Sequence, residues 1–311
     1  MYKEKRLPRS EFVRIRGLNY HVQIWVGPDG AAGALAPLVL VHGWMDVAAS
    51  YQFMVDAFSS AFMQGRTIIA PDWRGFGQTR AADAGASPGS YWFPDYLADL
   101  DFLLDHYAGA RQVDLAGHSM GGNIAMTYAG VRPERIRRLV NLEGFGLPAS
   151  KPAQAPGRYA KWMDELKGLQ RGDMALKAYD SVAGVASRLM KTNPRLSADK
   201  AGWLANHWAR PDNDGQWHIL GEAAHKVTSA NIYRVEETLA LYQRISAPVL
   251  AVEASDDSLS TWYKGDYKLA QYHERLRLIA RCQVAVVDDA GHMLHHDQPE
   301  QLALLLEEFL H

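Results

Sequence analysis

A serine framed by glycines, in the segment Gly-His-Ser-Met-Gly at 117–121, constrains this chain more than any other feature. It directly follows a short aliphatic run at 113–116 and directly precedes a stretch with helical spacing at 121–130. In that context the glycines permit a sharp turn from strand to helix, which exposes the Ser119 hydroxyl beside the first amides of the helix. The pattern predicts a nucleophilic serine at the edge of a sheet.

The rest of the chain alternates short apolar runs with longer helical patterns. An antiparallel hairpin is expected from 12–16 and 21–26, where apolar and polar residues alternate on both sides of a short turn. Buried strands are expected at 37–41, 67–70, 113–116, 138–142, 248–252 and 283–287, and helices at 50–62, 91–107, 121–130, 262–279 and 299–310. This succession predicts an α/β fold with a mostly parallel central sheet of about eight strands flanked by helices.

A change of pattern sets residues 147–245 apart. Prolines and glycines cluster between 144 and 157, and the sequence from 159 to 244 shows several helical patterns without a strand pattern. We therefore expect a core domain formed by 1–146 and 246–311, into which 147–245 is inserted as a helical cap.

Composition excludes several functional classes. Lys and Arg number 33 and Asp and Glu 35, so the formal charge of −2 offers no basic excess for a nucleic acid. The single cysteine, Cys282, excludes an internal disulfide framework and a multi-cysteine metal site. The charged first ten residues lack an apolar leader, and no apolar run approaches the ~20 residues that span a bilayer. We expect a cytoplasmic protein without membrane insertion.

His292 is the expected base for Ser119. It follows Asp-Asp-Ala-Gly at 288–291, in a loop after the last expected strand, where the carboxyl edge of the sheet presents it. A serine alone is a weak nucleophile at neutral pH, so the chemistry requires a histidine and an acid that orients it. His295 and His296 lie close by in sequence, but no carboxylate or cysteine stands beside them at a metal-binding spacing, so we expect no metal.

Three carboxylates are candidates for the acid. Asp256 and Asp257 lie in the loop after the strand expected at 248–252, which gives the chain order serine, acid, histidine. Glu143 directly follows the strand expected at 138–142 and reaches the same edge of the sheet. Position in the chain alone does not decide which of the three carboxylates is the acid.

The motifs in combination resemble the α/β-hydrolase fold superfamily, in its esterase-like branch with a serine nucleophile and a helical cap. Besides the serine motif, His-Gly-Trp at 42–44 resembles the family's oxyanion turn, and Asp-Trp-Arg-Gly-Phe-Gly at 72–77 resembles its DxRGxG loop. Gly291 and His292 resemble its GH motif. The likeness covers nearly the whole chain.

The resemblance implies a role for each of these residues. Ser119 matches the nucleophile and His292 the base, and the backbone amides of Trp44 and Met120 match the oxyanion hole. Such amides stabilise the negative charge that develops during acyl transfer, by about 3 kcal/mol per donor.

The resemblance also ranks the acids. Alignment of the segment that begins at Pro248 with the family's PVLxxxGxxD pattern places Asp257 at the acid, with Ala254 where a glycine is usual. That replacement keeps Asp256 as an alternative. Glu143 is the other alternative, since some haloalkane dehalogenases and the related coelenterazine luciferase place their acid at the end of the same strand.

Serine at position 119 implies hydrolysis through an acyl-enzyme, because relatives that act on epoxides or haloalkanes carry aspartate there. The expected substrate is a carboxylic ester of small or medium size. A carbon–carbon bond hydrolase or lactonase with the same triad is one alternative, and a ligand-binding or receptor protein without turnover is the other. No cofactor is expected, because no GxGxxG or Walker loop lies between a strand and a helix. The oligomeric state stays undetermined.

Overall fold

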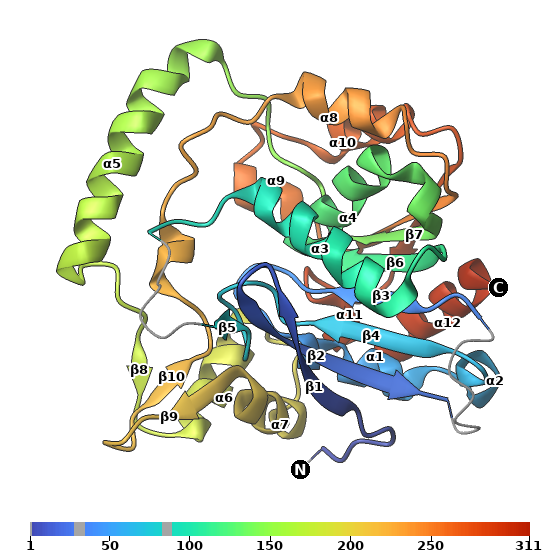
Figure 1. Cartoon of the computed structure of the whole chain (residues 1–311), viewed down its shortest axis with the longest axis horizontal. Helices are drawn as coiled ribbons and strands as arrows, with labels where there is room; N and C mark the ends of the chain where they lie inside the picture. Colours follow the sequence, from blue (N-terminus) through green and yellow to red (C-terminus); the bar gives the residue numbers. More distant parts are fainter. Residues whose placement is uncertain (1, 28–34, 83–88) are drawn as a thin grey trace.

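A nine-stranded sheet forms the centre of the molecule (Figure 1). The computed structural model describes residues 2–27, 35–82 and 89–311. The strands are β1 (Arg9–Ile15), β2 (Leu18–Val26), β3 (Leu38–Val41), β4 (Thr67–Pro71), β5 (Arg80–Ala81), β6 (Val113–His118), β7 (Ile136–Leu142), β11 (Val249–Ala254) and β12 (Cys282–Val287). Their order is β1-β2-β4-β3-β6-β7-β11-β12, with β5 paired to β2. From β4 to β12 all neighbours are parallel, which confirms the predicted α/β class.

Helices cover both faces of this sheet. They are α1 (Gln52–Ala57), α2 (Ser60–Met63), α3 (Phe93–Ala108), α4 (Met120–Val131), α8 (Val235–Tyr242), α9 (Ser258–Tyr263), α10 (Leu269–Leu276), α11 (Leu294–Asp297) and α12 (Pro299–Leu310). Figure 1 shows α3, α4, α8 and α10 on one side and α1, α11 and α12 on the other. Successive side chains of β3 point to opposite faces of the sheet. Val39 and Val41 pack in the hydrophobic core on the α3 and α4 side, and Leu38 and Leu40 pack in the core on the α1 and α12 side. The buried strands are therefore apolar throughout.

Two of the predicted helices are broken. The helix expected at 50–62 is a 3₁₀ turn followed by α1 and α2, because Phe58 leaves the helical region at ψ 143° and the Ser59 side chain caps α2. The helix expected at 262–279 is replaced by α9 and α10. Between them Lys264 and Gly265 adopt positive φ values of 49° and 89°, which stop a helix.

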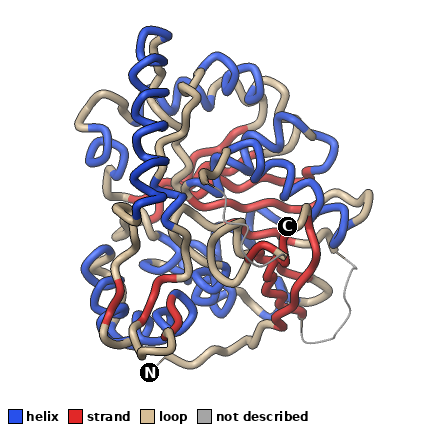
Figure 2. Tube along the Cα trace, turned by 60° about the vertical axis from the view of Figure 1, so that its left-hand side comes forward, coloured by secondary structure: helices blue, strands red, loops and turns tan. Residues whose placement is uncertain are grey.

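The segment 147–245 contains strands as well as helices, so the prediction of helices alone was wrong. Besides α8 it holds α5 (Ala155–Arg171), α6 (Val182–Thr192) and α7 (Ala198–Trp208), with the short strands β8 (Ala178–Tyr179), β9 (Ala209–Pro211) and β10 (Trp217–Ile219). These strands form a separate three-stranded sheet, which Figure 2 shows apart from the central one. Runs of two or three residues are too short to produce a visible alternation of apolar and polar residues.

Helix length is modest throughout. None of the described helices combines the length and the apolar content that a bilayer crossing requires.

Candidate active site

Ser119 stands at the sharp turn between β6 and α4. Its backbone has φ 53° and ψ −115°, a region that costs energy for a residue with a Cβ atom. Its amide donates to the carbonyl oxygen of Leu142 at 2.8 Å, which ties the turn to the end of β7. The fold thus maintains a strained conformation at the residue that the sequence singles out.

Two positions of the motif require glycine because neighbouring backbone atoms lie where a side chain would begin. A Cβ atom on Gly117 would lie 2.3 Å from the carbonyl oxygen of Gly121. A Cβ atom on Gly121 would lie 2.1 Å from the carbonyl oxygen of Val41, at the end of β3. Any larger residue would push α4 away from the sheet and move Ser119.

Glu143 occupies a buried position directly after β7. Its side chain is 1% exposed, and its backbone also has a positive φ of 56°. The backbone amide donates to the Val252 carbonyl oxygen at 3.0 Å, and Oε1 accepts from the Ala254 amide at 2.8 Å. Both bonds attach Glu143 to β11 and leave Oε2 available to another partner.

That partner is His292. Its Nδ1 lies 3.2 Å from Glu143 Oε2, and its carbonyl oxygen accepts from His118 Nε2 at 2.7 Å. The indole of Trp262 packs edge-on against the imidazole, with ring centroids 4.2 Å apart. The histidine is therefore held from three directions.

Neither of the two aspartates expected near His292 is paired with it in the structure. Asp257 is the N-cap of α9: Oδ1 accepts from the Ser260 amide at 2.8 Å and Oδ2 from the Ser260 hydroxyl at 2.5 Å. Asp256 forms an ion pair with Arg195, at 2.7 Å from Nη1. Both carboxylates are exposed and engaged elsewhere, whereas Glu143 is buried.

The turn at 42–44 lies against the serine. A Cβ atom on Gly43 would stand 3.2 Å from the Ser119 Cβ atom. His42 fixes this turn, since its Nε2 accepts from the Trp73 amide at 2.8 Å. Met120 is the first residue of α4, where backbone amides have no partner within the helix. The structure thus places Gly43, the residue before Trp44, against Ser119, and Met120 directly follows Ser119 at the start of α4.

Burial shifts the pKa values of the paired side chains in opposite directions. It lowers the pKa of His292 to about 3 and raises the pKa of Glu143 to about 7, the latter with help from the negative charges of Asp257 and Asp256. Both changes favour the uncharged forms. The pair therefore places an unprotonated imidazole beside a carboxyl group that ionises near neutral pH.

Two contacts with His292 were not predicted from the sequence. Trp262 covers His292 from α9, and His118 supports its backbone from the end of β6. His118 lies inside the serine motif, but neither the presence of a histidine there nor that of a tryptophan at position 262 indicates a contact with His292. Only the meeting of strand ends at one edge of the sheet brings them together.

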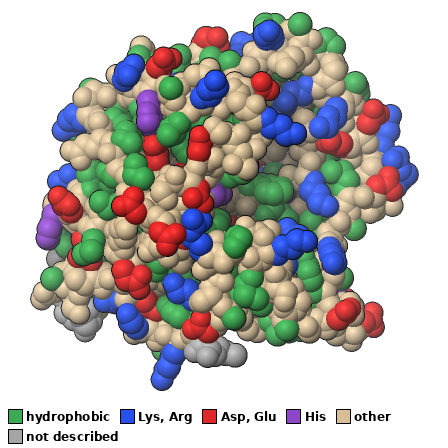
Figure 3. Space-filling view, turned by 180° about the vertical axis from the view of Figure 1, so that it is seen from behind, with side chains coloured by type: hydrophobic (Ala, Val, Ile, Leu, Met, Phe, Trp, Pro, Cys, Tyr) green, Lys and Arg blue, Asp and Glu red, His purple; other side chains and the backbone are tan. Residues whose placement is uncertain are grey.

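The molecular surface offers room for a ligand. Figure 3 shows a hollow in the face opposite that of Figure 1, with hydrophobic side chains at its floor and a histidine in its wall. Lys and Arg side chains stand around part of the rim. An apolar hollow with a few polar groups is the common form of a small-molecule site.

Comparison with known proteins agrees with this fold. The model of the alpha/beta hydrolase fold family matches residues 36–299, and the chain belongs to that family. It is accordingly a hydrolase.

Individual relatives share parts or most of the chain. A serine hydrolase-like protein of Danio rerio is 24% identical over 293 residues, which cover 93% of this chain and 84% of that protein. A 2-hydroxymuconate semialdehyde hydrolase of Pseudomonas putida is 33% identical over 111 residues, 36% of this chain and 37% of the other. The thioesterase domain from the curacin biosynthetic pathway superimposes with a TM-score of 0.79 at 22% identity, covering 96% of this chain and 98% of that one.

Proposed function

We propose that this protein is a serine hydrolase that cleaves carboxylic esters of small or medium size through an acyl-enzyme intermediate. The observation that carries the proposal is the strained turn at Ser119, whose chain neighbour His118 donates to the His292 carbonyl oxygen at 2.7 Å, while His292 Nδ1 lies 3.2 Å from the buried Glu143 carboxyl group. Strain at a residue with a nucleophilic side chain is typical of an active site.

In this proposal the triad is Ser119, His292 and Glu143. His292 accepts the serine proton during attack on the ester carbonyl and then donates it to the departing alcohol. Glu143 holds the imidazole by Nδ1 and stabilises the imidazolium that forms. Water repeats the sequence on the acyl-enzyme and releases the acid. The backbone amides of Met120 and Trp44 receive the developing oxyanion.

The geometry favours Glu143 over Asp257 for a physical reason. A triad acid must contact the imidazole, and the Glu143 carboxyl does so from a buried position. Asp257 already uses both of its oxygens to start α9.

The segment 147–245 is proposed as the cap over the site. Arg195, from that segment, pairs with Asp256 at 2.7 Å and with Asp289 at 3.2 Å, and Asp289 lies three positions before His292. The proposal places the enzyme in the cytoplasm, consistent with a single cysteine, and its partner is a small ester-like molecule.

Carbon–carbon bond hydrolysis is the second candidate. It rests on the likeness to the 2-hydroxymuconate semialdehyde hydrolase. A panel of simple esters, lactones and a ring-cleavage product with an activated carbon–carbon bond would separate the two, since the preferred class has the highest kcat/KM. Absence of turnover on all classes, with persistent ligand occupancy, would indicate a binding protein.

Covalent labelling tests the nucleophile without a choice of substrate. The protein is incubated with a fluorophosphonate and then subjected to intact-mass and peptide-map analysis. We expect one adduct on Ser119 in the wild type and in the control Ser187→Ala, which changes an exposed serine on α6. Ser119→Ala should carry no adduct and should lose at least about three orders of magnitude in turnover. An unlabelled wild type, or a variant that still turns over, would refute the mechanism.

A further inference from the structure

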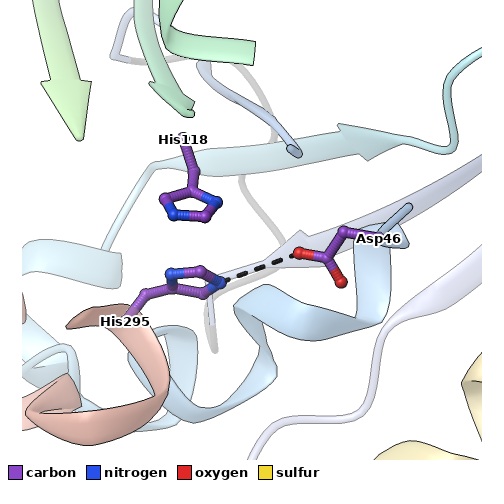
Figure 4. A group of neighbouring side chains, drawn as sticks. All are labelled: Asp46, His118 and His295. Atoms are coloured by element: carbon purple, nitrogen blue, oxygen red, sulfur yellow. Dashed lines mark ion pairs between the residues drawn. The ribbon is translucent and has the colours of Figure 1, made fainter. Parts of the chain in front are cut away.

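Three buried side chains from distant segments face one another behind Ser119. They are Asp46, from the turn after β3, His118, at the end of β6, and His295, on α11. One potential ligand atom from each lies within 4.8 Å of the others, and Figure 4 shows the two imidazole rings facing each other with the carboxylate beside His295. Among the described residues, these three side chains form a cluster of potential metal ligands.

These side chains lack the partners that buried polar groups need. Asp46 Oδ1 accepts from Ser50 and from Trp208, but Oδ2 has no hydrogen-bond partner among the described residues. Neither ring nitrogen of His295, which is fully buried, has such a partner in that part of the chain. Its Nε2 lies 4.0 Å from Asp46 Oδ2, beyond hydrogen-bond distance. Buried polar groups without hydrogen-bond partners destabilise a fold, so their retention calls for a ligand.

His118 is arranged as histidine ligands usually are. Its Nε2 donates to the His292 carbonyl oxygen at 2.7 Å, while Nδ1 has no hydrogen-bond partner among the described residues. A metal-binding histidine almost always donates its second ring N–H to a carbonyl or carboxylate, which fixes the tautomer and orients the free lone pair. The bond to His292 supplies this support.

We propose that Asp46, His118 and His295 bind one divalent transition-metal ion of the zinc class. Two imidazole nitrogens and one carboxylate oxygen are ligands that such ions prefer. Tetrahedral ligands at ~2.1 Å from the ion stand roughly 3.4 Å apart, so the three side chains would draw together by about 1 Å. The ion would tie three elements of the core, and His118 would bind through Nδ1.

This site is separate from the triad but adjoins it. His118 immediately precedes Ser119, and its bond to the His292 carbonyl links the ion to the loop that carries the proposed base. The role of the ion is structural in the first place, because all three ligands are buried. Sequence analysis missed the site because the required carboxylate, Asp46, lies far from the histidines in the chain.

Metal content and thermal stability test the proposal. Tag-free protein is expressed in Zn²⁺-supplemented medium, desalted and analysed by inductively coupled plasma mass spectrometry, and a second portion is stripped with a chelator and reloaded with Zn²⁺. The variants are His295→Phe and Asp46→Asn, the latter keeping an acceptor for Ser50 and Trp208. The control is His218→Ala, which removes an exposed histidine paired with Asp212.

The outcomes are distinct. We expect about one zinc per chain in the wild type and in the control, and less than about 0.1 in both variants. Zinc should raise the Tm of the stripped wild type by about 5 °C or more and leave the Tm of Asp46→Asn unchanged. Wild-type protein without retained zinc, or variants that retain as much as the wild type, would overturn the proposal.

Discussion

Glu143 and His292 stand 149 positions apart in the chain, yet Oε2 of the one lies 3.2 Å from Nδ1 of the other. The contact follows from strand order. Glu143 directly follows β7, which lies between β6, the strand that leads to Ser119, and β11. Parallel strands end at one edge of the sheet, so a carboxyl group there reaches a histidine from the following loops. The buried position of Glu143 has consequences for activity and for stability.

The pH dependence of activity should report the ionisation of this pair. Glu143, with a pKa raised to about 7 by burial, must be ionised to stabilise the imidazolium, and His292, with a pKa lowered to about 3, is neutral over the same range. We therefore expect kcat/KM for an activated ester to rise with pH through an apparent pKa near 7. The value belongs to the coupled pair.

Glu143→Gln provides the matched variant for that profile. Its residual activity should be flat between about pH 5 and pH 8, since neither partner then titrates in that range. Asp257→Asn should keep the wild-type profile. An unchanged acidic limb in Glu143→Gln would show that another group controls it.

Stability should respond to pH through the same carboxyl group. The pKa of Glu143 is about 7 in the folded chain against an ordinary value of 4.5, so the folded state binds its proton more tightly than the unfolded state does. The stabilising contribution is present below pH 4.5 and is lost as pH rises through 7. Above that pH the wild type contains a buried Glu143 carboxylate, whereas the side chain of the Glu143→Gln variant is uncharged.

Urea denaturation at two pH values checks this sign. Glu143→Gln should be more stable than the wild type at pH 8, by on the order of 2 kcal/mol. The difference should nearly vanish at about pH 4, where both side chains are neutral. A variant less stable than the wild type at pH 8 would contradict the proposed cost of burying the carboxylate.

Gly121 should tolerate no side chain. The added methyl group of Gly121→Ala would stand 2.1 Å from the Val41 carbonyl oxygen, so α4 must shift or the fold must loosen. We expect a loss of about 3 kcal/mol or more in unfolding free energy, with loss of activity.

The control is Gly202→Ala on α7, where a Cβ atom meets nothing within 4 Å. Alanine there should stabilise the protein by about 0.5–1 kcal/mol, because glycine in a helix costs that much. Equal effects of the two substitutions in urea denaturation would argue against the steric requirement at the serine turn.

Much of the core could be predicted because its signals are local. Each buried strand is a short apolar run with a turn after it, and the runs at 113–116 and 138–142 lie within β6 and β7. Predictions failed where tertiary contacts decide, as at Phe58, where an expected helix breaks, and in the short strands β8 to β10. These features have no periodic pattern long enough to detect.

In the candidate site, too, the features with a local sequence signal could be predicted, and those that depend on tertiary contacts could not. The turn at Ser119 depends on neighbouring glycines and was visible in the sequence. The choice between Glu143 and Asp257 depends on which carboxyl group is buried beside His292 and which caps a helix, and chain order does not encode this. Asp is itself a favoured N-cap residue, so the role of Asp257 in starting α9 had a local signal.

The rate of covalent labelling tests the central claim most directly. Second-order rate constants for fluorophosphonate modification are measured by intact mass for the wild type, Glu143→Gln and Asp257→Asn at pH 8. We predict that Glu143→Gln reacts about 10³-fold more slowly or worse, because the imidazole loses its orienting carboxylate. Asp257→Asn should stay within about threefold of the wild type, since asparagine also caps a helix. Slow labelling of Asp257→Asn with wild-type labelling of Glu143→Gln would contradict the account and return the acid to Asp257.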